Sequence, residues 1–211
     1  MDFLLRAAGS VCKLGILPGS FNPLTVAHLA LAEAALRNVD EVVFVLPQVF
    51  PHKPYSGASF DQRLSMLQSA VSHNPRLSVA ASQGGLFVDI ARECREAYGA
   101  GVGLSFLCGR DAAERIAGWD YGRPDAFLEM LREFDFLVAA RAGEYQPPRA
   151  LAGSFKSLEL DGPFDHVSSS EVRSRIGRGE PWRHLVPESI TGLVGEIYTQ
   201  RKNRQPCAEP L

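Results

Sequence analysis

Hydrophobic residues form two kinds of pattern along the chain: short continuous runs, and longer segments with helical spacing. The continuous runs predict β-strands at residues 11–17, 41–47, 76–82, 103–109 and 136–141. Between them, apolar residues three or four positions apart predict helices at residues 27–39, 60–72, 89–98, 112–119 and 124–134. Strands that alternate with helices in this way are typical of βαβ units, and they predict a parallel sheet.

The last third of the chain carries weaker signals. They predict, in order, a Gly/Pro-rich loop at 142–155, a weak strand at 155–160, a short helix at 169–176 and a terminal helix at 187–200. No repeat or linker divides the chain, so we expect a single domain over residues 1–211, with flexible tails at 1–10 and 202–211. The role of the 141–166 region stays open. The predicted fold class is α/β, a Rossmann-like three-layer fold with a central parallel sheet flanked by helices.

The composition of the chain narrows the classes of molecule to which it is expected to bind. Hydrophobic residues make up 45% of the chain and charged residues 22%, with a net charge of −2, so the chain is typical of globular proteins and lacks the basic surface that nucleic acid requires. No apolar run approaches the roughly 20 residues of a membrane span, and the N-terminus does not match a signal peptide. The four cysteines show no paired spacing, which favours a reduced, cytoplasmic setting. Cys108 ends a predicted strand with no histidine nearby in sequence, which favours a core residue over a nucleophile.

The turn after the first predicted strand carries the strongest candidate chemistry. Ligands of open parallel sheets bind beyond the carboxyl ends of the strands, and this turn lies at such an end. Gly19 lets the backbone approach a ligand closely, and Asn22 or Thr25 can cap the helix that follows Pro23. The N–H groups of that helix start form an anion site, and His28 lies within one turn of it. A lone histidine there is more often a capping or surface residue; within this turn a phosphate contact is favoured.

A second candidate anion site lies near the C-terminal end, in the segment HVSSSEVRSRIGRG. Ser168 followed three residues later by Glu171 matches a capping box that begins a helix. Ser169 and Arg173 are four residues apart, so they share one face at the helix N-terminus. A guanidinium beside free N–H groups suits a phosphate, while the alternative is a helix cap with a surface arginine.

These two segments resemble the nucleotidyltransferase superfamily. Its turn G-x-F-x-P-x-[HT]-x-x-H matches Gly19, Phe21, Pro23, Thr25 and His28, and its S-S-[ST]-x-[IV]-R stretch matches the residues that end at Arg173. Many members carry His at the position of Thr25 and Asp at the position of Asn22, and other branches carry Thr and Asn. Whether this difference alters the substrate stays open.

The resemblance implies a division of roles among these residues. Catalysis is expected from His28, Thr25 and Arg173, with the histidine contacting the ATP phosphates during attack at the α-phosphorus. The residues expected on the ATP side are Gly19, Ser20, Phe21, Gly109, Asp111, Ser168 and Ser169.

A third set of segments resembles one branch of the superfamily, the nicotinate mononucleotide adenylyltransferases. In that branch a P-H-K loop and a G-x-D…W segment surround the pyridine nucleotide, and His52, Lys53 and Trp119 stand at the corresponding positions. These three residues are therefore expected on the acceptor side. The alternatives are a half-buried core position for Trp119 and a solvated loop cation for Lys53.

The resemblance implies the reaction of ATP with nicotinate mononucleotide to give the dinucleotide and pyrophosphate. ATP is then a substrate accompanied by Mg²⁺, no metal site is expected on the protein, and the partners are small molecules. Adenylyl transfer to phosphopantetheine, cytidylyl transfer to an alcohol phosphate and a catalytically silent nucleotide-sensing domain are the alternatives. The sequence leaves open the choice between nicotinate and nicotinamide mononucleotide, and the oligomeric state.

Overall fold

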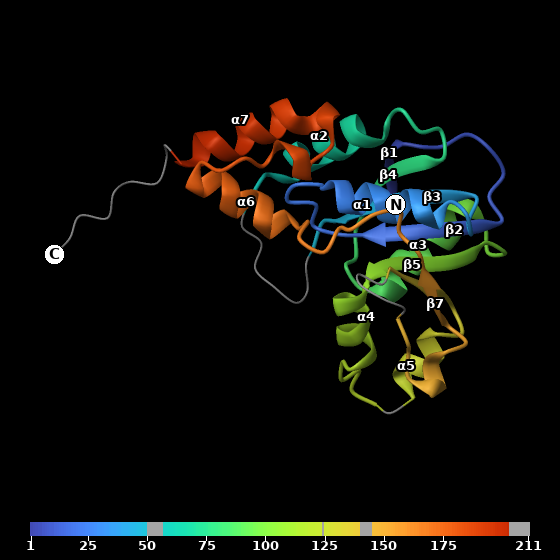
Figure 1. The fold of residues 1–211 in the computed structure, drawn as a ribbon. Coiled ribbons are helices and arrows are strands. Elements are labelled where there is room, and N and C mark those ends of the chain that lie inside the picture. The colour runs from blue at the N-terminus through green and yellow to red at the C-terminus, as the bar shows by residue number, and fades with distance from the viewer. Residues whose placement is uncertain (50–56, 124, 140–144, 203–211) are drawn as a thin grey trace.

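A seven-stranded sheet forms the centre of the molecule, with strand order β1-β4-β3-β2-β5-β6-β7 (Figure 1). The computed structural model describes residues 1–49, 57–123, 125–139 and 145–202. The strands are β1 (Asp2–Leu5), β2 (Lys13–Pro18), β3 (Glu41–Pro47), β4 (Leu77–Ser82), β5 (Gly103–Gly109), β6 (Asp135–Ala139) and β7 (Phe155–Leu158). Every neighbouring pair is parallel except β1 with β4.

The order of the parallel strands determines where a ligand fits. Counted from β2 along the chain, the parallel strands lie in the order third, second, first, fourth, fifth and sixth, which is the order of doubly wound nucleotide-binding sheets. The order reverses between β2 and β5, which are direct neighbours. Beyond Pro18 and Gly109, where these strands end, the connections diverge to opposite faces and leave a crevice at the sheet edge.

Helices cover both faces of the sheet. The helices are α1 (Val26–Ala35), α2 (Phe60–Val71), α3 (Phe87–Tyr98), α4 (Arg110–Ala117), α5 (Ala126–Met130), α6 (Ser169–Arg178) and α7 (Thr191–Lys202), with 3-10 turns η1 (Arg149–Leu151), η2 (Arg183–Leu185) and η3 (Glu188–Ile190). α1, α2, α6 and α7 lie on one side, and α3, α4 and α5 lie on the other (Figure 1). None of the helices described is long and apolar enough to span a membrane.

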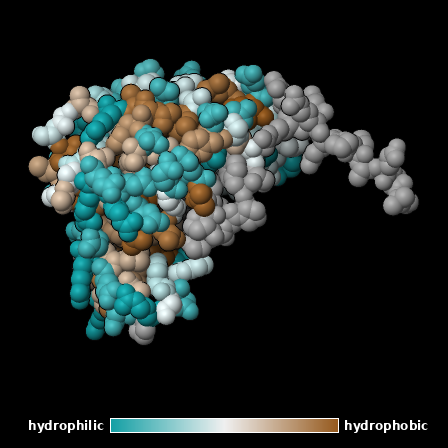
Figure 2. Space-filling model, turned by 180° about the vertical axis from the view of Figure 1, so that it is seen from behind, coloured by the Kyte–Doolittle hydropathy of each residue, from teal (hydrophilic) through white to brown (hydrophobic). Residues whose placement is uncertain are grey.

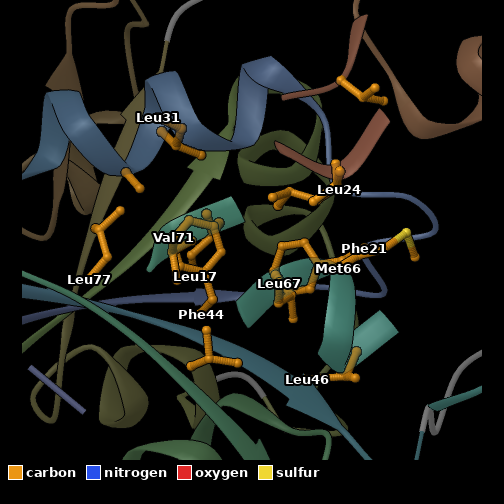
Figure 3. Close-up of a cluster of buried hydrophobic side chains, with 14 of the residues drawn as sticks. Leu17, Phe21, Leu24, Leu31, Phe44, Leu46, Met66, Leu67, Val71 and Leu77 are labelled. Carbon is orange, nitrogen blue, oxygen red and sulfur yellow. The ribbon is translucent and has the colours of Figure 1, made fainter. Parts of the chain in front are cut away.

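Alternation along the strands builds a separate core on each face. In β3, Phe44 and Leu46 pack with the α1 and α2 side chains, as Figure 3 shows, while Val43 and Val45 pack with the α3 side. All seven β3 residues are buried, as expected of a strand covered on both faces. The predicted α/β three-layer fold with a central parallel sheet is confirmed.

The expectation of a flexible tail at residues 1–10 is wrong for its first part. Asp2–Leu5 forms β1, an antiparallel edge strand on β4. The Arg6 guanidinium follows, stacked 4.9 Å from the ring centroid of Tyr98 in α3, and the Ala7 N–H donates to Ser78 Oγ at 2.8 Å. These tertiary contacts hold β1 in place. With four residues, the strand is too short to be predicted from the spacing of its hydrophobic residues. Residues 203–211 of the other predicted tail lie outside the described residues.

Candidate active site

The turn that joins β2 to α1 is shaped by an aromatic ring. Phe21 has a φ of 43°, an uncommon conformation for a bulky residue, and its side chain is only 1% exposed. The ring packs against Phe44 and edge-on against His28, with centroids 5.7 and 5.4 Å away, among the core residues drawn in Figure 3. A Cβ at Gly19 would lie 2.9–3.3 Å from atoms of the same ring. The G-x-F spacing therefore has a packing reason: the glycine makes room for the ring.

Gly19→Ala is expected to lower the free energy of unfolding by about 1–3 kcal/mol, because the added methyl group must displace a fully packed ring. Urea denaturation of both proteins measures this difference. Gly101→Ala is the control, since a Cβ there meets nothing within 4 Å. Equal losses in the two variants would contradict the packing role of Gly19.

Thr25 and His28 form the start of α1 as one hydrogen-bonded unit. Thr25 is the N-cap residue and is fully buried. Its N–H donates to His28 Nδ1 at 3.1 Å, and its Oγ1 lies 2.7 Å from the same nitrogen. Because an amide N–H only donates, Nδ1 must accept, so the neutral imidazole carries its proton on Nε2. The arrangement is a capping box with histidine in the place of glutamate, and it leaves Nε2–H as the donor of the ring.

The back of the turn is held by the buried side chain of Asn22. Its Oδ1 accepts hydrogen bonds from the Ala58 N–H at 3.2 Å and from the Tyr198 hydroxyl of α7. A Cβ on Gly57 would lie 2.1 Å from Asn22 Nδ2, so only glycine permits this close approach. The bond between Asn22 and Pro23 is cis. One amide therefore joins the turn to the segment before α2 and to the terminal helix.

The second predicted motif meets the first directly. Ser169 Oγ at the start of α6 donates to the Pro23 carbonyl at 2.8 Å, and Arg173 Nη1 donates to the Asn22 carbonyl at 2.6 Å. Arg173 Nη2 also lies 3.3 Å from Ser170 Oγ. The two helix N-termini that the sequence predicts as separate anion sites are thus tied together through backbone carbonyls of one turn.

Only half of the predicted capping box at α6 is formed. Ser168 Oγ accepts from the Glu171 N–H at 3.1 Å, as expected of an N-cap. The Glu171 carboxylate instead pairs with Arg175 at 2.7 Å, one turn further along the helix. The basic partner at position i+4 competes for the carboxylate and draws it away from the cap.

A cavity of about 360 Å³ lies where these helix starts face the ends of β2 and β5. Its polar side is formed by Thr25, His28 and the serines 168–170. Its apolar lining residues include Leu31, Leu107, Ala112, Ala139, Leu160, Phe164 and Val167. No carboxylate is among the described residues that line it. An anionic group beside the helix starts and a flat apolar ring against the apolar residues match this lining.

The remaining predicted residues fall into three groups. Gly109 lines the cavity, and Asp111 is exposed in the first turn of α4 next to it. Trp119 is 55% exposed, and it lines a separate hollow of about 450 Å³ beside α4 and α5. Figure 2 shows that the lobe carrying these helices has a largely hydrophilic surface with hydrophobic side chains between. His52 and Lys53 lie outside the described residues.

Known proteins match this chain over most of its length. A model of the cytidylyltransferase-like family matches residues 16–175, from β2 to α6. A protein of Citrifermentans bemidjiense described as "Probable nicotinate-nucleotide adenylyltransferase" is 32% identical over 210 residues, covering 87% of this chain and 96% of that protein. One of Trichlorobacter lovleyi with the same description is 31% identical over 217 residues, covering 92% of this chain and 100% of the relative.

Solved structures share the fold. Plasmodium falciparum nicotinic acid mononucleotide adenylyltransferase complexed with NaAD has a TM-score of 0.67 at 18% identity, over 89% of this chain and 97% of that chain. The same enzyme complexed with APC has a TM-score of 0.64, over 91% and 96% of the two chains. On its sequence relatives and its matching family model, the chain is a nucleotidyltransferase of the cytidylyltransferase-like family, and within it belongs to the nicotinate-nucleotide adenylyltransferases.

Proposed function

We propose that the chain transfers the adenylyl group of ATP to nicotinate mononucleotide, giving the dinucleotide and pyrophosphate in NAD biosynthesis. The observation that carries this proposal is the cavity at the strand-order reversal, which is lined by the N-termini of α1 and α6 and by apolar side chains. The triphosphate lies at the two helix starts, and the adenine ring lies against the wall formed by Leu107, Ala139 and Phe164.

The chemistry needs no general base. The second pKa of a phosphate monoester is about 6, so the acceptor phosphate is already a nucleophile at neutral pH. One of its oxygens bonds to the α-phosphorus as the bond to the bridging α–β oxygen breaks, and pyrophosphate leaves with that electron pair. Catalysis then consists of bringing two anions together and stabilising the charge that accumulates on the phosphoryl oxygens.

His28 and Arg173 carry out that stabilisation. His28 donates its Nε2–H to a phosphate oxygen, since Nδ1 is engaged by Thr25. Arg173 uses one Nη on the Asn22 carbonyl and keeps further N–H groups for phosphate oxygens. Thr25 orients the imidazole, and Ser168 and Ser169 shape the second helix start.

Mg²⁺ belongs to the substrate in this scheme. Within the part of the chain that the structure describes, no cluster of three or more His, Cys, Asp or Glu side chains could hold a metal ion. We infer that the ligands of Mg²⁺ are mainly triphosphate oxygens and water, which this ion prefers. Bound Mg²⁺ would neutralise part of the triphosphate charge as the two anions meet.

The acceptor extends from the α4 side of the cavity toward the separate hollow that Trp119 lines. Trp119 offers an exposed indole face for the pyridine ring, Asp111 holds a ribose hydroxyl, and Lys53 contributes charge for the negative groups of the acceptor, with His52 also on the acceptor side. The partners are small molecules in the cytoplasm, without nucleic acid.

Trp119→Ala is expected to raise KM for the acceptor roughly 5- to 150-fold, because stacking on an aromatic ring contributes about 1–3 kcal/mol. KM for ATP should change little, since the residue does not line the ATP cavity. Leu128→Ala is the matched control, because Leu128 is exposed in the same hollow but has no flat ring. An equal change in both KM values, or a change in KM for ATP alone, would contradict the acceptor role.

The decisive experiment is an acceptor screen. Pyrophosphate release is measured with ATP or CTP, each combined with nicotinate mononucleotide, nicotinamide mononucleotide, phosphopantetheine or an alcohol phosphate. The proposal expects release with ATP and a pyridine mononucleotide, with the nicotinate form preferred. Release with another acceptor alone would support one of the alternative transferases. No release with any pair would support a nucleotide-sensing domain.

A further inference from the structure

A buried arginine lies behind the phosphate-binding turn. Arg63 is in the first turn of α2 and is 3% exposed, although its neighbours at helical spacing, Phe60, Met66 and Leu67, are apolar and pack in the core. Arginine is almost never fully buried unless its guanidinium has polar partners. Its presence at this position therefore calls for a role beyond packing.

The guanidinium reaches from α2 to the turn. Arg63 Nη1 donates to the Ser20 carbonyl at 3.1 Å, and Nε donates to the Ser59 carbonyl at 3.4 Å. The guanidinium carbon also lies 5.6 Å from the ring centroid of Phe60, within cation–π range. Two guanidinium groups thus hold the turn by its carbonyls: that of Arg63 on Ser20 and that of Arg173 on Asn22.

Peptide geometry links this contact to the direction of the next N–H in the turn. The bond between Ser20 and Phe21 is trans, so its N–H points away from the side to which its carbonyl points. With the Ser20 carbonyl held toward α2, the Phe21 N–H faces the opposite way. That N–H has no acceptor among the described residues, although Phe21 is buried, and buried N–H groups nearly always have one. An acceptor supplied by a ligand would satisfy it.

We propose that Arg63 is a positioning residue, which fixes the Ser20–Phe21 peptide so that the Phe21 N–H donates to a phosphate oxygen of the nucleotide. The inference rests on ATP binding at the turn, which is part of the proposed function, and not on the identity of the acceptor. Fixing this peptide also maintains the positive φ of Phe21, which the backbone does not favour by itself.

Binding of ATP and of adenosine to Arg63→Met and Arg63→Lys tests the proposal. Isothermal titration gives the Kd of each ligand, and thermal unfolding reports whether each variant is folded. Arg63→Met removes all hydrogen-bond donors of the side chain, whereas Arg63→Lys keeps the positive charge and a single donor nitrogen. Arg76→Met is the matched control, because the Arg76 guanidinium also holds backbone carbonyls, those of Leu36, Val39 and Asp40, at the opposite end of the sheet.

The expected result is a Kd for ATP raised about 10- to 100-fold in Arg63→Met, the usual effect of losing a hydrogen bond to a charged group. The increase should be smaller in Arg63→Lys, and the Kd for adenosine should stay within about twofold of wild type in both, since adenosine has no phosphates. Should Arg63→Met fail to fold, the lysine variant decides by the same comparison.

Wild-type affinity for ATP in the folded variants would overturn the proposal, as would equal weakening of ATP and adenosine or an equal loss in Arg76→Met. If wild-type protein binds ATP but forms no dinucleotide from a pyridine mononucleotide, the proposed acceptor is wrong. The test of Arg63 is still valid in that case, because it measures only the binding of ATP and adenosine.

Discussion

Replacing His28 by alanine is expected to lower kcat by about 10²–10³, the usual cost of removing one placed donor from a transition state, with a smaller effect on the KM for ATP. The reason lies in the contacts of the ring. Nδ1 accepts from the Thr25 N–H, so only Nε2–H can reach a ligand. Charge grows on the phosphoryl oxygens as the acceptor attacks, so the donor contributes most at that stage. Steady-state kinetics of the two proteins measure the effect.

Two amide variants separate the catalytic role of His28 from its role in the helix cap. Asparagine places an acceptor near the position of Nδ1 and keeps the contact with Thr25, but it has no donor near Nε2. Glutamine extends a donor to the Nε2 position. His28→Gln should therefore retain more of kcat than His28→Asn, while the two differ little in thermal stability. The reverse order, or wild-type turnover in the alanine variant, would mean that His28 serves only the cap.

The central sheet could be predicted because several strands and the helices between them each show a clear hydrophobic pattern. Strands such as β3 are buried on both faces and read as continuous apolar runs, and the helices between them have helical spacing. β1 lacks both features: it has four residues, it lies at the edge, and its pairing with β4 depends on contacts remote in sequence. Such an element is determined by tertiary structure, which local patterns do not contain.

The sequence predicts the two helix N-termini of the candidate site, but it does not predict the hydrogen bonds that join them. Spacing alone indicates two helix N-termini suited to anions, but it does not indicate that Arg173 bonds to the Asn22 carbonyl. Asn22 reads in sequence as a possible helix cap, whereas its side chain joins three segments through Ala58 and Tyr198. One signal was available for Arg63, a charged residue whose neighbours at helical spacing are apolar. The sequence cannot give its partner, because the Ser20 carbonyl lies on another element.

Arg173→Ala is expected to lower kcat/KM for ATP by about 10²–10³, because it removes both a charge beside the triphosphate and a contact that shapes the turn. Arg173 Nη1 donates to the Asn22 carbonyl at 2.6 Å, and Nη2 lies 3.3 Å from Ser170 Oγ, a serine that lines the cavity. The guanidinium therefore stands between the two helix starts, and removing it affects both. Urea denaturation run beside the kinetics separates lost catalysis from lost stability.

Arg173→Lys tests the role of the guanidinium more sharply, since it keeps the positive charge but loses the planar group with its several fixed N–H donors. A lysine ammonium is a compact donor on a flexible stem; it cannot hold the Asn22 carbonyl, contact Ser170 and face a phosphate with one fixed geometry. We expect this variant to lose at least about tenfold in kcat/KM for ATP. Arg178→Lys on the same helix is the control, because Arg178 pairs with Glu180 at the surface and should tolerate the change. If Arg173→Lys has full activity and wild-type ATP affinity, Arg173 acts only as a point charge or a surface residue, and the planar geometry of its guanidinium has no part in binding phosphate.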